Sequence, residues 1–365
     1  MKIAFYGSSL LSAYWNGAAT YYRGLLRALA EHGHDITFYE PDAFDRQQHR
    51  DIDPPGWCRV VVYEASLPAL RRVAAEAARA DVVVKASGVG FQDDALLEAT
   101  LDAAAPDALT IYWDVDAPAT LAAIAADPDH PLRAALARLD LVLTYGGGDP
   151  VVAGFRAVGA RACAPVYNGL DIETHHPVDP DPRFAADLGF LGNRLPDREE
   201  RVNAFFFAAA RRSPDRSFLL GGAGWTPEVL PAGVRAIGHV PTAEHNAFNV
   251  TPLAVLNISR ASMAATGFSP ATRVFEAAGA GACLITDAWE GIDLFLQPGE
   301  EILVARDGAD VAEILAGLTP ARAQEIGRRA RARVLAEHTY DRRAAELDLL
   351  LRAARHAAGA RGRAA

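Results

Sequence analysis

The hydrophobic pattern along the chain alternates between short apolar runs and longer stretches with apolar residues on one helical face. Apolar runs of about four to eight residues predict buried strands, and the longer periodic stretches predict amphipathic helices. The first pair is the run Lys2–Tyr6 followed by a helix over 20–32, and such pairs recur to about residue 305. Strands that alternate with helices predict an α/β fold in which helices cover both faces of a doubly wound parallel sheet.

The length of 365 residues predicts two domains, because one hydrophobic core rarely grows beyond about 250–300 residues. Proline and acidic residues become frequent over 168–186, where we expect a linker. This places a Rossmann-like domain at 1–167 and a second one at 187–338. A helix with an apolar stripe over 339–358 is expected to pack back on the first domain, and residues 359–365 to be disordered.

Charge and cysteine content argue against several classes of protein. The net charge of -10 disfavours nucleic acid as a partner, because a phosphate backbone requires a basic face. The three cysteines have no metal-site spacing, and His175 and His176 have no cysteine or carboxylate at ligand spacing, so we expect no metal. No apolar run approaches the roughly 20 residues of a membrane helix, which predicts a cytoplasmic protein without integral membrane contact.

A helix flanked by signals for its start and end lies between residues 269 and 287. Ser269 and Pro270 predict its start, because the hydroxyl can cap free N–H groups and proline suits the first helical position. Gly279 and Gly281 predict its end, before an apolar run that predicts a strand. The free N–H groups and the positive dipole end at the start of such a helix form an anion site.

Two charged residues of this helix suggest the ligand. Arg273 lies in the first turn, where a cation is unfavourable unless an anion is bound, and Glu276 follows one turn later. A carboxylate there can accept both hydroxyls of a ribose while the helix start and the arginine hold a diphosphate. The alternative is a solvated surface pair on an ordinary crossover helix.

Several motifs resemble the CgeB-like spore-maturation family of GT-B glycosyltransferases. They are Leu256–Met263, Gly267–Pro270, Arg273–Ala277, Thr286–Asp287, Trp289–Gly291 and Tyr112–Leu121. The resemblance implies two Rossmann-like domains facing a cleft, with the last helix crossing back to the first domain. It also implies metal-independent transfer of a sugar from a nucleoside-diphosphate sugar, with UDP as the expected nucleotide and no cofactor. The acceptor would be a small molecule, a glycan or a protein, and the oligomeric state is not predicted.

The resemblance places the donor on the second domain. Glu276 would bind the ribose, and Arg194, Arg273 and Thr272 would bind the diphosphate. Further donor-side residues would be Asn193, Arg198, His239, Val240, Arg260 and Ser269. The simpler interpretation makes Arg198 part of a charged surface helix and His239 a packing residue.

The acceptor is expected on the first domain. Asp114 and Asp116 follow a predicted strand, and one of them would act as general base for the acceptor or hydrogen-bond the donor sugar. The alternative is that one caps the next helix while the other is solvated. Small or turn-forming residues would leave room for the acceptor: Gly7, Asn16, Gly17, Ala18 and Gly147. The glycines at 146–148 equally suit a mobile turn.

One position departs from the larger class of retaining GT-B enzymes. That class has a glutamate eight residues before the ribose-binding one, and here the position is Phe268. Both retaining and inverting chemistry therefore stay open. Two rival functions are a sugar-nucleotide epimerase or hydrolase and a non-catalytic nucleotide-sugar-binding protein. A nicotinamide dehydrogenase is disfavoured, because neither domain has the glycine fingerprint after its first strand.

Overall fold

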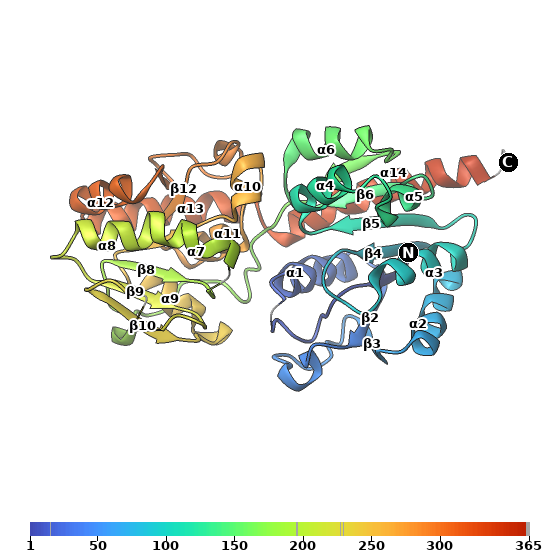
Figure 1. The fold of residues 1–365 in the computed structure, drawn as a ribbon, viewed down its shortest axis with the longest axis horizontal. Helices are drawn as coiled ribbons and strands as arrows, with labels where there is room; N and C mark the ends of the chain where they lie inside the picture. The colour runs from blue at the N-terminus through green and yellow to red at the C-terminus, as the bar shows by residue number, and fades with distance from the viewer. Residues whose placement is uncertain (15, 195, 227, 229, 363–365) are drawn as a thin grey trace. The chain divides into compact units, whose positions relative to one another are not determined.

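The computed structural model describes residues 1–362 apart from 15, 195, 227 and 229. The chain forms two compact units, which are coloured along the sequence in Figure 1. Unit 1 comprises Met1–Tyr167 together with the chain from Tyr340 onward, and unit 2 comprises Asn168–Thr339. Each unit contains one parallel sheet with helices on both faces, as predicted.

The sheet of unit 1 has seven parallel strands in the order β3-β2-β1-β4-β5-β6-β7. Their bounds are β1 Lys2–Tyr6, β2 Asp35–Asp42, β3 Arg59–Glu64, β4 Val82–Ala86, β5 Leu109–Asp114, β6 Leu141–Thr144 and β7 Cys163–Pro165. In the central register, Phe5 pairs with Phe38 on one side and Val84 on the other. The strands are rich in aromatic and β-branched residues, which suit a pleated surface buried on both faces.

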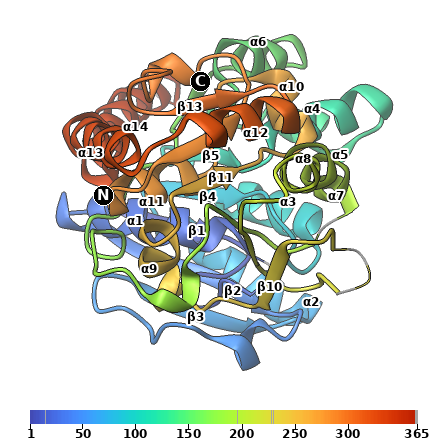
Figure 2. The same ribbon diagram turned by 90° about the vertical axis from the view of Figure 1, so that its left-hand side faces the viewer.

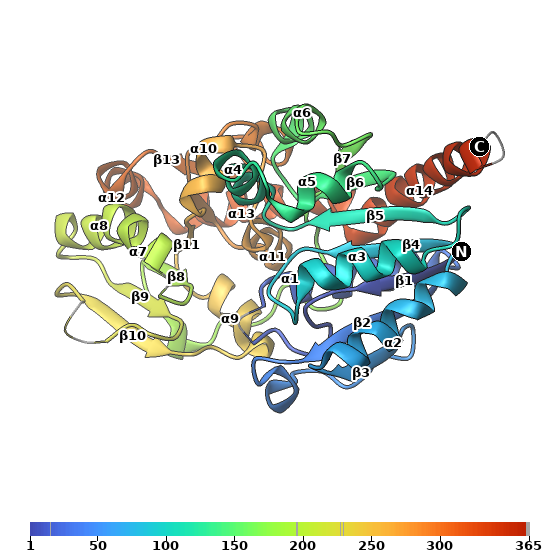
Figure 3. The same cartoon turned by 45° about the vertical axis from the view of Figure 1, so that its right-hand side comes forward.

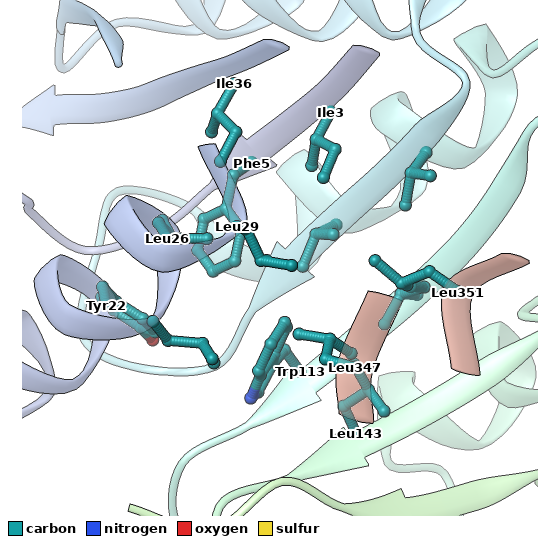
Figure 4. Packing of buried hydrophobic residues seen from close by; sticks show 14 of the residues in the cluster. Ile3, Phe5, Tyr22, Leu26, Leu29, Ile36, Trp113, Leu143, Leu347 and Leu351 are labelled. Atoms are coloured by element: carbon teal, nitrogen blue, oxygen red, sulfur yellow. The ribbon is translucent and has the colours of Figure 1, made fainter. Parts of the chain in front are cut away.

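Helices of unit 1 cover both faces of this sheet. They are α1 Ala18–Glu31, α2 Leu67–Ala74, α3 Asp93–Ala103, α4 Ala117–Ala126, α5 Pro131–Leu136, α6 Gly148–Ala157 and α14 Tyr340–Gly362. On one face, α1 and α14 pack with side chains of β1, β2, β4, β5 and β6, as the close-up in Figure 4 shows. On the other face, α2 and α3 pack near β3 and β4, and both lie together in Figure 3.

The last helix belongs to unit 1 although it follows unit 2 in the chain. Leu347 and Leu351 enter the same core as Trp113 (Figure 4). Polar contacts hold the helix as well, since Asp348 Oδ1 lies 2.7 Å from His34 Nε2. The helix runs to Gly362, whereas we expected disorder from residue 359. Residues 363–365 of that predicted tail lie outside the described residues.

The sheet of unit 2 has six parallel strands in the order β10-β9-β8-β11-β12-β13. Their bounds are β8 Leu188–Leu191, β9 Phe218–Gly221, β10 Val234–Gly238, β11 Ala254–Asn257, β12 Leu284–Asp287 and β13 Leu303–Ala305. Residues 168–186, where a linker was predicted, fall within this unit. Asn168 donates from Nδ2 to the Pro270 carbonyl at 2.9 Å, and Leu170 forms a bridge with Thr339.

Helices also cover both faces of the second sheet, as Figure 2 shows. They are α7 Pro196–Val202, α8 Ala208–Arg212, α9 His245–Val250, α10 Ala261–Thr266, α11 Thr272–Ala280, α12 Gly308–Gly317 and α13 Pro320–Glu337. A π-helical turn at Asn203–Phe207 joins α7 to α8. Short 3-10 turns occupy Arg46–His49, Ala75–Arg79, Pro182–Phe184, Thr242–Glu244 and Ile292–Leu294.

Alternation along β8 separates the two layers of unit 2. Phe190 packs with Phe206 in the core beneath α8, whereas the Cβ position of Gly189 faces Phe248 of α9. The helices α9 and α11 contact each other on that second face. None of the described helices is both long enough and apolar enough to cross a membrane.

Candidate functional site

The order of the strands directs attention to one edge of the sheet in unit 2. From β8 the chain builds outward through β9 and β10, then returns to place β11 on the other side of β8. In doubly wound sheets ligands bind beyond the carboxyl ends of the strands at such a reversal point. The loop at 192–194 follows β8, and the segment at 258–272, which ends at the start of α11, follows β11. Most predicted donor residues therefore lie along this edge.

The helix that carries Glu276 begins later than predicted. Its first residue is Thr272 and its N-cap is Ala271, which provides no side-chain hydrogen bond. Ser269 is not the cap: the side chain is buried, and among the described residues Oγ has no hydrogen-bond partner. Other contacts hold this segment, because Phe268 adopts φ 49 and donates its N–H to the Glu290 carbonyl at 2.7 Å. The helix start thus presents N–H groups that no side chain of the cap residue satisfies.

Glu276 and Arg273 do not form a solvated surface pair. Glu276 is only 8% exposed, and Arg273, which is partly buried, donates from Nη1 to Asn249 Oδ1 at 3.2 Å. Burial raises the pKa of Glu276, but the nearby His175, Arg273 and His245 and the Thr272 hydroxyl outweigh it and leave the pKa below its usual value. Burial lowers the pKa of Arg273. The structure therefore places an ionised carboxylate, with little contact with water, one turn into the helix.

Two histidines that the sequence did not connect with Glu276 lie beside it. His175 Nε2 is 3.9 Å from Glu276 Oε1, and the ligating atoms of His175, His245 and Glu276 all lie within 4.8 Å of one another. Burial, together with the charge of Arg273, lowers the pKa of His245 to about 4. No spacing in the sequence signals this cluster, because its members come from a loop, the start of α9 and the middle of α11.

The residues after β8 have partners of their own. Arg194 Nη2 pairs with Glu199 Oε1 at 2.8 Å, and Asn193 Oδ1 accepts the Ala223 N–H at 2.9 Å. Arg198, in the first turn of α7, brings Nη1 to 3.0 Å from where a Cβ of Gly192 would lie. The glycine thus allows the guanidinium to approach the carboxyl end of β8 closely. Arg198 therefore lies against the end of β8, whereas the charge of Arg194 is paired with that of Glu199.

The remaining residues predicted on the donor side differ in how exposed they are. His239 follows β10 and is exposed, whereas Val240 is buried, and its carbonyl oxygen lies 3.3 Å from His245 Nε2. Arg260 is the partly buried N-cap residue of α10. Val240 therefore adjoins the cluster around Glu276 through its backbone, and His239 projects into solvent.

The two aspartates of unit 1 have different environments. Asp114 is fully buried, and its Oδ1 accepts both the Ser87 hydroxyl and the Asp116 N–H at 2.9 Å. Burial raises the pKa of Asp114. The carboxylate ties the end of β4 to the end of β5 and is not exposed, so the structure lends no support to a role as base, which stays a prediction. Asp116 is partly exposed at the N-cap position of α4.

The small residues predicted to make room for an acceptor serve mostly the fold. A Cβ on Gly7 would lie 2.6 Å from Phe38 Cζ, so a ring fills the space expected for a ligand. Gly147 has φ +90, and a Cβ there would overlap Val151. Asn16 is buried and donates from Nδ2 to the carbonyl oxygens of Ser9 and Ser12. Gly17 differs, because it is exposed and a Cβ there would meet no atom within 4 Å. Ala18, the first residue of α1, is partly buried.

A surface pocket of ≈ 370 Å³ lies elsewhere in unit 2. Its lining comes from β13, α12 and α13 and comprises Leu303, Val304, Asp310, Glu313, Ile314, Gly317, Leu318, Arg322 and Ile326. It includes none of the predicted donor residues, so it is not the site described above.

Comparison with known proteins agrees with this architecture. Residues 198–348 match the family model described as glycosyl transferase-like. No curated protein matches the chain in sequence.

Solved structures with the same fold cover nearly the whole chain at low identity. Sucrose-phosphate synthase from Thermosynechococcus elongatus is 15% identical, with 96% of this chain and 98% of that chain covered and a TM-score of 0.68. HepE from Anabaena, in complex with UDP and glucose, is 15% identical over 97% of this chain and 100% of that chain, with a TM-score of 0.65. An alpha-glucosyltransferase in complex with UDP-glucose and DNA containing an abasic site is 12% identical over 96% of this chain and 99% of that chain, with a TM-score of 0.71. The chain therefore has the GT-B fold of these transferases.

Proposed function

We propose that this protein is a glycosyltransferase that moves a sugar from a nucleoside-diphosphate sugar to an acceptor hydroxyl. The finer resemblance to the CgeB-like family and the choice of UDP as the nucleotide belong to this proposal. One observation carries it: the uncapped start of α11 is followed, one turn later, by the buried and ionised Glu276. The glycosyl transferase-like match over 198–348 and the UDP-bound neighbours support the same assignment.

The start of α11 suits the diphosphate. An oxygen anion there would accept the free N–H groups and interact with the positive end of the helix dipole. The buried Ser269 hydroxyl, which has no partner among the described residues, would donate a further hydrogen bond. When the bond to the sugar breaks, these fixed donors stabilise the charge that develops on the leaving diphosphate. The chemistry then requires no metal.

Glu276 suits the ribose. A carboxylate with a lowered pKa accepts hydrogen bonds from both ribose hydroxyls, and a buried position makes such bonds stronger than they would be in water. Thr272, whose side chain forms a hydrogen bond with Glu276, orients the carboxylate. Arg273 lies beside this group and balances its charge.

For the acceptor we propose a hydroxyl on a small molecule, a glycan or a protein. Asp116, which is partly exposed at the start of α4, is our candidate for the base that takes the acceptor proton. The net charge of -10 argues against a nucleic-acid acceptor, although one structural neighbour is bound to DNA.

The test is a ligand panel followed by a turnover assay. Thermal unfolding is measured with UDP, GDP, dTDP, CDP, ADP and NAD in the presence of EDTA, because a ligand of the folded state raises the midpoint by mass action. We expect one diphosphate to stabilise the protein, and the matching nucleotide sugar to be consumed only when an acceptor is supplied. Stabilisation by none of the diphosphates, or by NAD alone, overturns the proposal. Consumption of the sugar nucleotide without acceptor would instead indicate the epimerase or hydrolase.

A further inference from the structure

Three side chains that commonly bind metal ions meet in unit 2. His175 comes from the loop before the 3-10 turn at Pro182–Phe184, His245 is the first residue of α9, and Glu276 lies in α11. Their ligating atoms are all within 4.8 Å of one another. The cluster depends on the contact between α9 and α11, since neither helix carries more than one of the three.

The Nε2 atom of His175 faces the Glu276 carboxylate and has no hydrogen-bond partner among the described residues. The residue is only 3% exposed, and Nδ1 lies 3.0 Å from the Thr174 hydroxyl, which itself donates to the Asp171 carbonyl at 3.4 Å. A hydroxyl has one hydrogen, so Nδ1 is the donor to Thr174 and Nε2 keeps its lone pair. Across the described residues Nε2 has no hydrogen-bond partner, and it faces Glu276 Oε1 at 3.9 Å. Two buried acceptors that face each other are stabilised by a positive species bound to both.

His245 likewise has one ring nitrogen in a hydrogen bond and one that keeps its lone pair. Its Nε2 lies 3.3 Å from the Val240 carbonyl, which can only accept, so Nε2 carries the hydrogen and Nδ1 keeps its lone pair. A ring nitrogen binds a metal ion through its lone pair, and each of the two imidazoles keeps one such nitrogen.

We propose that His175, His245 and Glu276 bind a divalent transition-metal ion of the Zn²⁺ class. Two imidazole nitrogens and one carboxylate oxygen form the ligand set of zinc sites that keep an open coordination position. The Thr174 hydroxyl and the Val240 carbonyl each contact one ring nitrogen, and such outer-shell partners orient metal-binding histidines. Metal bonds of about 2.0–2.1 Å place tetrahedral ligands about 3.3 Å apart, so side-chain shifts of about 1 Å complete the site.

Arg273 limits the strength of this site. Its charge acts on both His245 and Glu276, and a nearby guanidinium repels a divalent cation. The ion should therefore bind reversibly and more weakly than a structural zinc ion. Removing the charge with Arg273→Met should tighten metal binding.

The site shares Glu276 with the ribose, a consequence that depends on the proposed function. A carboxylate that ligates a metal ion accepts weaker hydrogen bonds from ribose hydroxyls. The metal ion would thus act as an inhibitor that competes with the donor, and not as a cofactor of the transfer.

Metal binding is tested on the full, tag-free chain after treatment with EDTA and dialysis. Titration with Co²⁺ should give visible absorption bands that saturate at one equivalent and that Zn²⁺ abolishes by displacement. His175→Phe and His245→Leu should each lower Zn²⁺ affinity by at least about 10-fold. The matched control is His176→Gln, because His176 neighbours His175 in sequence but is exposed and should not affect binding.

Absence of saturable binding, or an equal affinity in His175→Phe and the unchanged chain, overturns the proposal. Should a variant fail to fold, X-ray absorption of the Zn²⁺-loaded unchanged chain decides, because it detects imidazole ligands directly. A spectrum without imidazole refutes the site.

Competition is measured separately by titrating UDP with and without Zn²⁺. Because UDP itself binds Zn²⁺ in solution, the effect is compared with that in His245→Leu, which keeps Glu276. We expect Zn²⁺ to weaken UDP binding more in the unchanged chain than in the variant. Binding of Zn²⁺ without any binding of UDP would refute the nucleotide site alone, and the reverse result would refute the metal site alone. Binding of both without competition would show that the ion does not use Glu276, which overturns the proposed ligand set.

Discussion

The replacement Glu276→Gln tests the proposed ribose contact quantitatively. Glutamine keeps the size of the side chain and one acceptor oxygen, but it removes the charge. A hydrogen bond to a charged group contributes about 1.5–3 kcal/mol and a neutral one about 0.5–1.5 kcal/mol. Because the carboxylate would accept both ribose hydroxyls, the loss is roughly 2–3 kcal/mol, or about 30- to 150-fold in the UDP dissociation constant.

The assay is isothermal titration of UDP at pH 7, where the lowered pKa leaves Glu276 ionised. Glu313→Gln is the matched control, because Glu313 is exposed on α12 and the same substitution there should leave UDP binding unchanged. A second ligand, 2′-deoxy-UDP, lacks one of the two hydroxyls. It should bind more weakly than UDP to the unchanged chain, with a smaller difference in Glu276→Gln, as expected of groups in contact.

Two results would refute this reasoning. One is equal affinity of Glu276→Gln and the unchanged chain for UDP. The other is an equal penalty for 2′-deoxy-UDP in both proteins, which would show that the hydroxyl and the carboxylate act independently. The second result is informative even if the substitution weakens binding by altering the structure around α11.

Three further predictions concern stability and turnover. Gly7→Ala should lower the free energy of unfolding by about 1–3 kcal/mol, because the added Cβ would lie 2.6 Å from Phe38 Cζ. Gly17→Ala should change it by less than about 0.5 kcal/mol, because the added Cβ would meet no atom within 4 Å. Urea denaturation measures both variants. Asp114→Asn should reduce the free energy of unfolding, whereas Asp116→Asn should reduce turnover at unchanged UDP affinity. A turnover defect confined to Asp114→Asn would reverse our assignment of Asp116 as the base. Folding lowers the pKa of His245 from 6.5 to about 4, so between these values the unfolded chain binds the proton more readily than the folded chain does. The contribution of the neutral His245 to the free energy of unfolding is therefore complete above pH 6.5 and is lost as the pH falls toward 4. That contribution is about 3 kcal/mol, and urea denaturation of His245→Leu should show a shallower loss of stability over this range.

The strand and helix pattern predicted the two parallel sheets because it depends on local periodicity. The run Lys2–Tyr6 is β1, and the apolar stripe that includes Leu347 and Leu351 packs in the core of unit 1. Boundaries were less accurate where tertiary contacts override local preference. Ser269 and Pro270 suggested a helix start, yet α11 begins at Thr272, and the Pro270 carbonyl accepts a hydrogen bond from Asn168 of a distant segment.

The sequence by itself determined the fold class and the helix that carries Glu276, since apolar periodicity and a strand–helix alternation are local properties of a chain. Only the tertiary structure decided which polar groups meet and which are buried. It buried Asp114 against Ser87, filled the space above Gly7 with Phe38, and brought His175 and His245 to Glu276. These contacts join segments far apart in sequence, and their geometry depends on how helices and strands pack, which no spacing of residue types along the chain records.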